Sequence, residues 1–279
     1  MKKRYIVLGV VGFGIFYVSR PWLPMLYFWG DSIEVEINTP AHLVPSVGGD
    51  YTSSSCQSLS MSSGNWVDGQ RGGDAKLEKI SDTQYRAKVY YKDFGPCSWK
   101  LRSVGWSLEY KDAGAVLSGA TGGSGGGNTI MIGTDAYFYK SERESQRYSD
   151  DEVMVINRQL FPYVIPDPYQ NTKGLYLSNR KMMRRESPYY FNPYKHYATA
   201  KIIYNVTVDE SSLEGLTADE AYRIQEERLD REKKEKREKE AAELRQFREE
   251  RDAYLHELEL KKNNGATPLS AHPTTPISD

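Results

Sequence analysis

The sequence predicts a mainly β protein: an antiparallel β-sandwich, immunoglobulin-like in broad architecture, with an N-terminal membrane helix and a long charged C-terminal α-helix. Three observations predict this fold class. Short runs of alternating apolar and polar residues, separated by turn residues, recur between residues 31 and 210. A mostly apolar run follows three basic residues at the start of the chain. A stretch near the C-terminus consists mainly of Glu, Lys and Arg.

The strand pattern is clearest in YRAKVYY, residues 85–91, where apolar and basic residues alternate with the period of two of a strand with one buried face. Gly95-Pro96 predicts a turn, and the alternation resumes over 97–110. We therefore expect a hairpin, with a bulge near Gly105, whose second strand lies beside an earlier strand. Similar runs are residues 32–37, 52–56, 128–139, 152–161 and 198–209. About seven short strands separated by turns favour a sandwich or a barrel.

Cys56 and Cys97 are the only cysteines, and their even number in an exported chain predicts a disulfide. The chain-entropy model gives such a loop about 4 kcal/mol of stabilisation. Structural thiols and a reactive thiol are the alternatives. A metal site would need further Cys or His at short spacing, so no metal and no cofactor are expected. Immunoglobulin domains carry a Tyr two positions before the second cysteine, where this chain has Gly95, so the topology stays open.

The N-terminal segment begins with Lys2, Lys3 and Arg4 and continues with uncharged, mostly apolar residues 5–18. A cleaved secretory signal needs small residues at its cleavage site, and none follow this run in that pattern, so an uncleaved anchor is favoured. A buried N-terminal core helix is the remaining alternative.

The anchor is expected to contact the membrane over residues 5–28, with tryptophans and tyrosines at the interface. The basic start predicts a single-pass inner-membrane protein with its N-terminus in the cytoplasm and its bulk in the periplasm.

No catalytic residue is predicted, and the chain is expected not to be an enzyme. The stretch GATGGSGGGNT, residues 119–129, contains G-x-S-x-G around Ser124, but a nucleophile elbow needs a helix after the Ser and a β-type run follows. A flexible hairpin connection is the favoured interpretation. A net charge of −1 gives no support for nucleic-acid binding.

Residues 160–200 form the most suggestive surface, because long segments without clear secondary structure are often functional. The segment is rich in Tyr and Pro and has a basic cluster, and Tyr and Arg are enriched at binding hot spots. A flap that covers one end of the sandwich is an equal alternative. The residues predicted to bind a partner are Arg184, Arg185, Tyr189, Tyr190, Phe191 and Tyr194.

The charged segment, residues 217–262, is predicted to be one long helix that begins with a capping box of Thr217 and Glu220. Acidic residues precede basic ones by four positions at several places, which stabilises an isolated helix. Residues 230–240 offer no apolar seam, so a solvated stalk is favoured over self-association as a coiled coil. Residues 263–279 are expected to be disordered.

Four segments result: residues 1–30 as the anchor, 31–210 as the disulfide-linked sandwich, 217–262 as the charged helix and 263–279 as the tail. The function expected is a membrane-anchored, exported binding module that recognises another envelope protein. The alternatives are an immunity-type inhibitor of an envelope-targeted toxin, an enzyme acting on cell-wall or other glycans through residues 160–200, and a structural envelope component.

Overall fold

A computed structural model describes residues 19–26, 30–133, 148–149, 151–167, 172–178, 189–193 and 196–263. The described part divides into two compact units, with the division between Tyr222 and Arg223. The first unit contains both β-sheets, and residues 31–217 within it are called the β domain below. The prediction of a mainly β chain with one long C-terminal helix is confirmed.

The described strands form two sheets. The seven-stranded sheet has the order β4 (Leu77–Lys79), β5 (Gln84–Tyr90), β1 (Ser32–Asn38), β13 (Lys201–Val208), β10 (Val153–Asp167), β11 (Thr172–Ser178) and β7 (Ala120–Gly122). The six-stranded sheet has the order β3 (Trp66–Asp74), β2 (Leu43–Leu59), β6 (Lys100–Tyr110), β8 (Gly125–Ile132), β12 (Tyr189–Phe191) and β9 (Tyr148–Ser149). Short helical elements are η1 (Arg20–Trp22), α2 (Ala113–Val116) and η4 (Ser211–Leu213).

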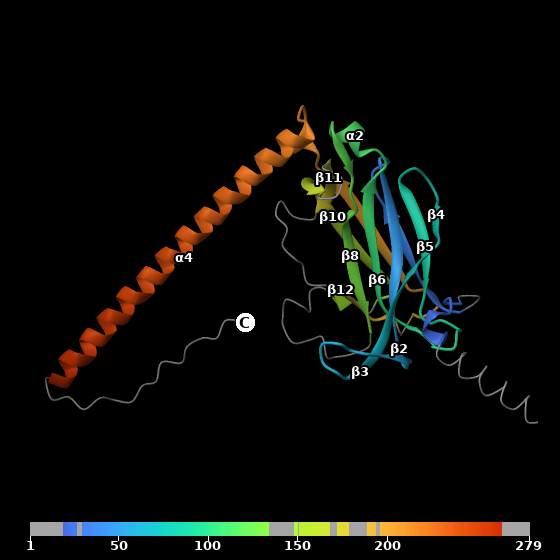
Figure 1. Cartoon of the computed structure of the whole chain (residues 1–279), viewed down its shortest axis with the longest axis horizontal. Helices are drawn as coiled ribbons and strands as arrows, with labels where there is room; N and C mark the ends of the chain where they lie inside the picture. Colours follow the sequence, from blue (N-terminus) through green and yellow to red (C-terminus); the bar gives the residue numbers. More distant parts are fainter. Residues whose placement is uncertain are drawn as a thin grey trace, which may run out of the picture. The chain divides into compact units, whose positions relative to one another are not determined.

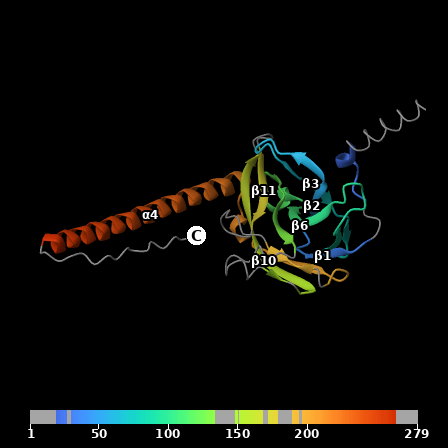
Figure 2. The same cartoon turned by 90° about the horizontal axis from the view of Figure 1, so that it is seen from below.

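The two sheets lie face to face around one apolar core (Figures 1 and 2). The alternation seen in the sequence produces this core, because every second side chain of a strand points to the same face. Trp106 of β6 and Tyr204 of β13 meet across the two layers, with their ring centroids 4.9 Å apart. The Tyr204 hydroxyl donates to the carbonyl oxygen of Gly126 at 2.9 Å, so this fully buried side chain also has its polar atom satisfied.

The strand pairing is mixed, which corrects the prediction of an antiparallel arrangement. β13 runs parallel to both β1 and β10, and β12 runs parallel to β8 and β9. Parallel neighbours need long connections, and the chain provides them by crossing from one sheet to the other. The predicted hairpin of residues 85–91 and 97–110 forms only next to its turn, where Lys92 and Lys100 make an antiparallel bridge. Beyond this bridge the prediction is wrong, because β5 and β6 belong to different sheets. β6 does lie beside β2, as expected.

The described parts of residues 160–200 contain strands, which corrects the prediction of a long segment without secondary structure. These strands are the end of β10, all of β11 and β12. Pro162 and Pro166 fit within β10 because β10 pairs only with β11 beyond Leu160, so that the ring nitrogen of a proline can face the side without a ladder.

The glycine-rich stretch is also not a flexible connection. Gly122 ends β7, and Gly125, Gly126 and Gly127 begin β8. A Cβ atom on Gly125 would lie 2.6 Å from the carbonyl oxygen of Leu177 in the opposite sheet. Glycine is required here because the two backbones approach too closely for any side chain. As expected, a strand and not a helix follows Ser124.

The disulfide between Cys56 and Cys97 is confirmed, with the two Cα atoms 5.4 Å apart. Cys56 lies in β2, and Cys97 lies in the connection that takes the chain from β5 in one sheet to β6 in the other. The carbonyl oxygen of Cys97 also accepts hydrogen bonds from the hydroxyls of Ser53 and Ser55. The bond therefore fixes β2 to a crossing between the sheets.

Of the predicted anchor segment, residues 1–30, the apolar run 5–18 lies outside the described residues. Among the helices that the structure describes, none has the length and apolar character needed to cross a membrane. The segment that follows, residues 19–26, is held against the β domain. The Arg20 guanidinium donates to the carbonyl oxygen of Ser55 at 2.8 Å, and the Arg71 guanidinium donates to those of Pro21 and Leu23.

The charged helix α4 (Ala218–Asn263) begins at the predicted capping box. The backbone N–H of Thr217 donates to the Glu220 carboxylate at 2.9 Å, and the backbone N–H of Glu220 approaches the Thr217 hydroxyl at 3.4 Å. Its 46 residues correspond to about 69 Å at 1.5 Å per residue. The predicted tail, apart from its first residue, lies outside the described residues.

Candidate functional site

A groove of about 740 Å³ opens where β4 and β3, each at the edge of its sheet, lie near one another. We call it the β4–β5 groove. It draws its lining from β2, from the β3–β4 connection, from β4 and from β5. The lining residues are Tyr51, Gly73, Asp74, Ala75, Lys76, Leu77, Glu78, Arg86, Ala87, Lys88, Val89 and Tyr90.

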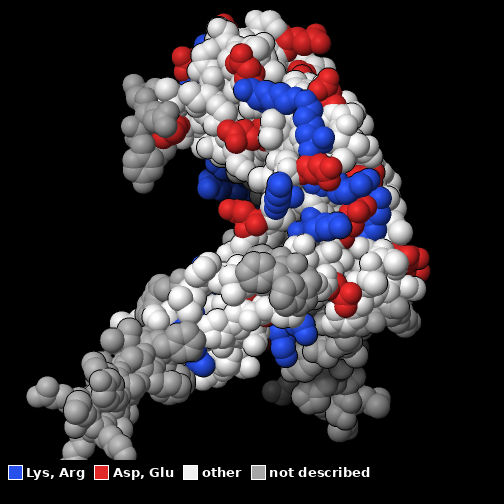
Figure 3. Space-filling view, turned by 90° about the vertical axis from the view of Figure 1, so that its right-hand side faces the viewer, with Lys and Arg blue, Asp and Glu red and all other residues white. Residues whose placement is uncertain are grey.

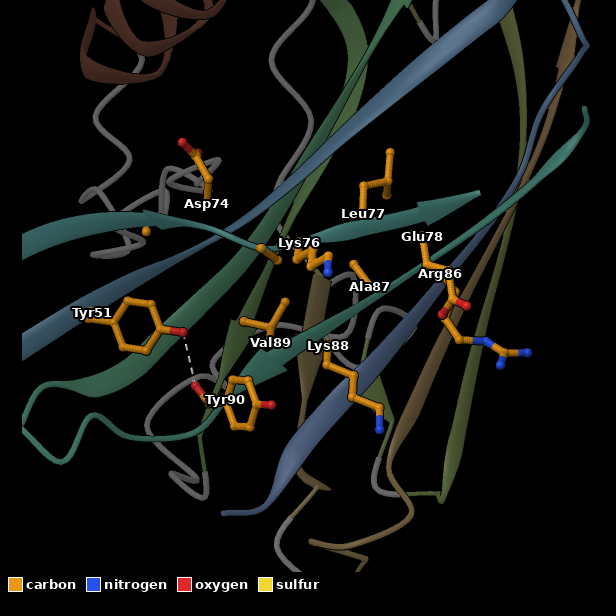
Figure 4. Close-up of a pocket in the computed structure, with 12 residues that line it drawn as sticks. Tyr51, Asp74, Lys76, Leu77, Glu78, Arg86, Ala87, Lys88, Val89 and Tyr90 are labelled. Atoms are coloured by element: carbon orange, nitrogen blue, oxygen red, sulfur yellow. Dashed lines mark hydrogen bonds between the residues drawn. The ribbon is translucent and has the colours of Figure 1, made fainter. Parts of the chain in front are cut away.

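The apolar part of the lining comes from side chains that are buried between the sheets. Ala87 and Val89 point inward from β5, and Tyr51 reaches them from β2 (Figure 4). The Tyr51 hydroxyl donates to the carbonyl oxygen of Tyr90 at 3.0 Å, which fixes the ring against β5. Gly49 provides the space for this contact, because a Cβ there would lie about 3 Å from both the Tyr51 ring and Val89.

Charged residues also contribute to the groove lining. Alternation along β5 places Arg86 and Lys88 on the face opposite to Ala87 and Val89 (Figure 4). Asp74, Lys76 and Glu78 complete the set from the β3–β4 connection and β4. Figure 3 shows the same side of the molecule, where Lys and Arg side chains are interspersed with Asp and Glu. The groove lining therefore includes both signs of charge, at the edge and on the outer face of β5.

An ion-pair network on the outer face of the seven-stranded sheet holds part of this rim in place. The Arg86 guanidinium lies 3.5 Å from the Glu34 carboxylate, which in turn lies 3.1 Å from the Lys201 ammonium. The same ammonium lies 2.7 Å from the carboxylate of Glu36, and Gln84 donates to that carboxylate at 2.9 Å. Ion pairs and hydrogen bonds therefore link the side chains of β5, β1 and β13 across the sheet.

Glu36 is the buried member of the network, with 9% of its surface exposed. The hydrogen bond from Lys201 lowers the pKa of the Glu36 carboxyl, and the bonds from Gln84 and Asn38 act in the same direction against the opposing effect of burial. The hydrogen bond to Glu36 correspondingly raises the pKa of Lys201. Both groups are therefore charged at neutral pH.

The residues predicted to bind a partner lie elsewhere. Tyr189, Tyr190 and Phe191 form β12, within the six-stranded sheet. Phe191 is fully buried in the core, whereas the two tyrosines are half-buried. The Arg158 guanidinium lies over the Tyr189 ring, 5.3 Å from its centroid. Arg184, Arg185 and Tyr194 lie outside the described residues.

Sequence reasoning did not find the β4–β5 groove. Arg86 and Lys88 were recognised as the polar side of a strand, but nothing in their pattern indicates that Tyr51 and Lys76 lie beside them. Across the part of the chain that the structure describes, no three His, Cys, Asp or Glu side chains gather as a metal site.

Comparison with known proteins identifies no relative. No protein-family model, no curated protein and no solved structure matches the chain.

Proposed function

We propose that the protein is a membrane-anchored, exported binding module that recognises another envelope protein, and that it does so through the β4–β5 groove. The groove supports this proposal because it combines a buried apolar lining with a charged, solvent-facing rim. Protein interfaces have this organisation: an apolar centre excludes water, and a polar rim gives orientation and specificity. A partner segment with one apolar side chain between charged neighbours would fit it.

The proposed location is the periplasmic side of the inner membrane, with a single-pass anchor in residues 1–30 that contacts the membrane over residues 5–28 and has its N-terminus in the cytoplasm. The basic residues before the apolar run support this orientation. The disulfide supports an oxidising compartment, because disulfides rarely persist in the cytoplasm. We assign the β domain, with its two facing sheets, to the β-sandwich class in this proposal.

Photo-cross-linking in intact cells tests the proposal. A photoreactive phenylalanine replaces Lys88 at the groove or, as the matched control, Lys100, an exposed lysine at the start of β6 outside the groove lining. We expect a discrete protein adduct from position 88 and none from position 100, and mass spectrometry of the adduct identifies the partner. Equal adducts at both positions, or none at position 88 and none at Lys76, would exclude the groove as the binding site.

Charge reversal gives an independent readout. Lys88→Glu reverses one rim charge on an exposed side chain, so the fold should be retained while the adduct formed from position 76 decreases several-fold. Lys100→Glu makes the same change outside the groove and should leave that adduct unchanged. If the adduct proves to contain an envelope-targeted toxin and not a resident envelope protein, the immunity-type alternative replaces the present proposal.

A further inference from the structure

The turn that joins β2 to β3 carries apolar side chains that the β domain does not cover. We define the hairpin tip as residues 57–67. Trp66 is 68% exposed and Met61 is 95% exposed, while Leu59 and Val67 are 50% and 42% exposed. Leu59 and Trp66 are directly opposite in the strand register, so their side chains lie on the same face of the hairpin. Several large apolar side chains exposed on one turn are typical of an interaction surface.

The hairpin tip is also uncharged. The sequence has no Asp, Glu, Lys or Arg from Tyr51 to Val67, and the turn itself consists of Ser, Gly and Asn with Met61. This composition contrasts with the charged rim of the β4–β5 groove. A surface that contacts protein usually keeps a charged rim, whereas a segment that enters a lipid interface avoids ionised groups and favours Trp.

The base of the hairpin tip is fixed. Cys56, the residue before the tip, is bonded to Cys97. Gly69, two residues after it, packs so closely that a Cβ would lie 2.0 Å from the Cys56 carbonyl oxygen. Within the turn, the backbone N–H of Ser60 donates to Asn65 at 2.9 Å and that of Gly64 donates to Ser60 at 2.8 Å. The apolar side chains are therefore presented by a closed, anchored turn.

The same hairpin holds the chain that leaves the predicted anchor. Arg20 donates to the carbonyl oxygen of Ser55 on β2, and Arg71 on β3 donates to Pro21 and Leu23. Ser55 and Leu59 are separated by about 13 Å of strand at 3.3 Å per residue. In Figure 1 the hairpin and the blue segment 19–26 both lie at the lower end of the β domain. The two features therefore lie at the same end of the β domain.

We propose that the hairpin tip inserts Leu59, Met61 and Trp66 into the lipid interface beside the anchor, as a second point of membrane attachment. The inference rests on the membrane anchoring proposed above. It adds that the β domain lies against the bilayer in a fixed orientation, because the anchor exit and the hairpin tip touch the membrane together. The binding partner of the hairpin tip is therefore the lipid surface itself.

Tryptophan quenching by brominated lipid tests this inference. The full-length protein and its Trp66→Phe variant are reconstituted in phosphatidylcholine–phosphatidylglycerol vesicles, with and without lipids brominated at carbons 6 and 7. The difference between the two proteins isolates the emission of Trp66 among the five tryptophans. We expect brominated lipid to reduce this difference emission at least two-fold. Different migration of the variant on gels with and without reductant confirms that its Cys56–Cys97 disulfide has formed.

A matched control uses the other end of the same strand. Val44 of β2 is 39% exposed, and Val44→Trp in the Trp66→Phe background places an exposed tryptophan far from the tip. Its difference emission should be unaffected by bromination. An unquenched Trp66 signal, or equal quenching at both positions, would overturn the inference.

The remaining tryptophans separate this failure from failure of the anchor. Trp22 and Trp29 belong to the predicted membrane segment and its interface, so their emission in Trp66→Phe should also be quenched. Quenching there without quenching of Trp66 would overturn the hairpin inference and leave the anchor standing. No quenching of any tryptophan would overturn both. A photoreactive phenylalanine at Met61 that captures a single protein in cells, and no lipid, would show that the tip binds a protein instead.

Discussion

The chain crosses between the two sheets on opposite sides of the β domain, and the two sides are built differently. At the β7–β8 crossing, the glycine backbone of β8 packs directly against the opposite sheet. Gly125 lies against the backbone of Leu177, and Gly126 lies against the side chains of Leu160 and Leu177. At the crossings near β4 and β5, the sheets are not closed in this way. The β4–β5 groove opens there, and a disulfide joins β2 to the β5–β6 connection.

The difference shows two ways of holding the two sheets together where the chain crosses between them. Where glycine permits direct contact, the layers are closed by dense packing and leave no room for a ligand. On the side of the β4–β5 groove, the sheets do not pack backbone to backbone. There a disulfide and a network of ion pairs stabilise the neighbouring strands.

Removing the disulfide should have the largest effect, because it acts on the open side. Replacing Cys56 and Cys97 together by Ser should lower the free energy of unfolding by about 4 kcal/mol, from the increased entropy of the unfolded chain. Denaturant titration of the full-length protein in detergent measures this. Reductant should reproduce the loss in the natural protein and have no effect on the double variant. A loss below about 1 kcal/mol would show that the groove side does not depend on the bond.

A methyl group at the closed side should cost somewhat less. Gly125→Ala places a Cβ 2.6 Å from the Leu177 carbonyl oxygen, and relieving that overlap should cost about 1–3 kcal/mol. Gly72→Ala is the control on the open side, since its nearest neighbour would be 3.9 Å away, and it should be neutral or stabilising by up to about 1 kcal/mol. Similar losses from both would mean that the two sides are equally tight.

The ion pairs on the open side should matter only where they are buried. Lys201→Met leaves the Glu36 carboxylate without its cation and should cost about 1–2 kcal/mol. Lys79→Met removes a pair of the same 2.7 Å length, with Asp82, but both partners are exposed and stability should not change measurably. Equal effects would show that burial does not set the strength of these pairs.

The smallest effect expected is a pH dependence. The pKa of Glu36 is lowered from its ordinary value of 4.5 on folding, so its contribution to stability is complete above that value and is lost as the pH falls through the folded pKa. Glu36→Gln should therefore flatten the acid limb of the stability curve below about pH 4.5. An unchanged acid limb in a folded Glu36→Gln variant would contradict this assignment.

Local features of this fold were predictable from the sequence, whereas pairings between distant segments were not. The alternation of YRAKVYY correctly identified Tyr85, Ala87 and Val89 as buried, because the period of two depends only on neighbouring residues. The disulfide had no alternative partner, and the capping box depends on two residues three apart. The sheet to which a strand belongs is decided by distant partners, so β5 and β6 were wrongly joined.

The groove and the glycine contacts were missed for the same reason. A glycine-rich stretch looks the same whether it is flexible or pressed against Leu177, because the neighbour that decides is far away in sequence. The groove combines Tyr51, Lys76 and Lys88, which become neighbours only once three elements have come together. The predicted Tyr and Arg surface had a compositional signal but no information about burial, and Phe191 belongs to the core.

The place of β13 between β1 and β10 has a consequence for how the chain matures. β1 is the first strand that the structure describes, yet one of its two neighbours in the sheet, β13, is the last strand among the described residues. Until that strand emerges, one side of β1 presents an unsatisfied ladder, and such long-range pairing is slow to form. Nascent chains should therefore pass through a stage in which they depend on chaperones, and a truncation before Lys201 should aggregate even though its disulfide can already form.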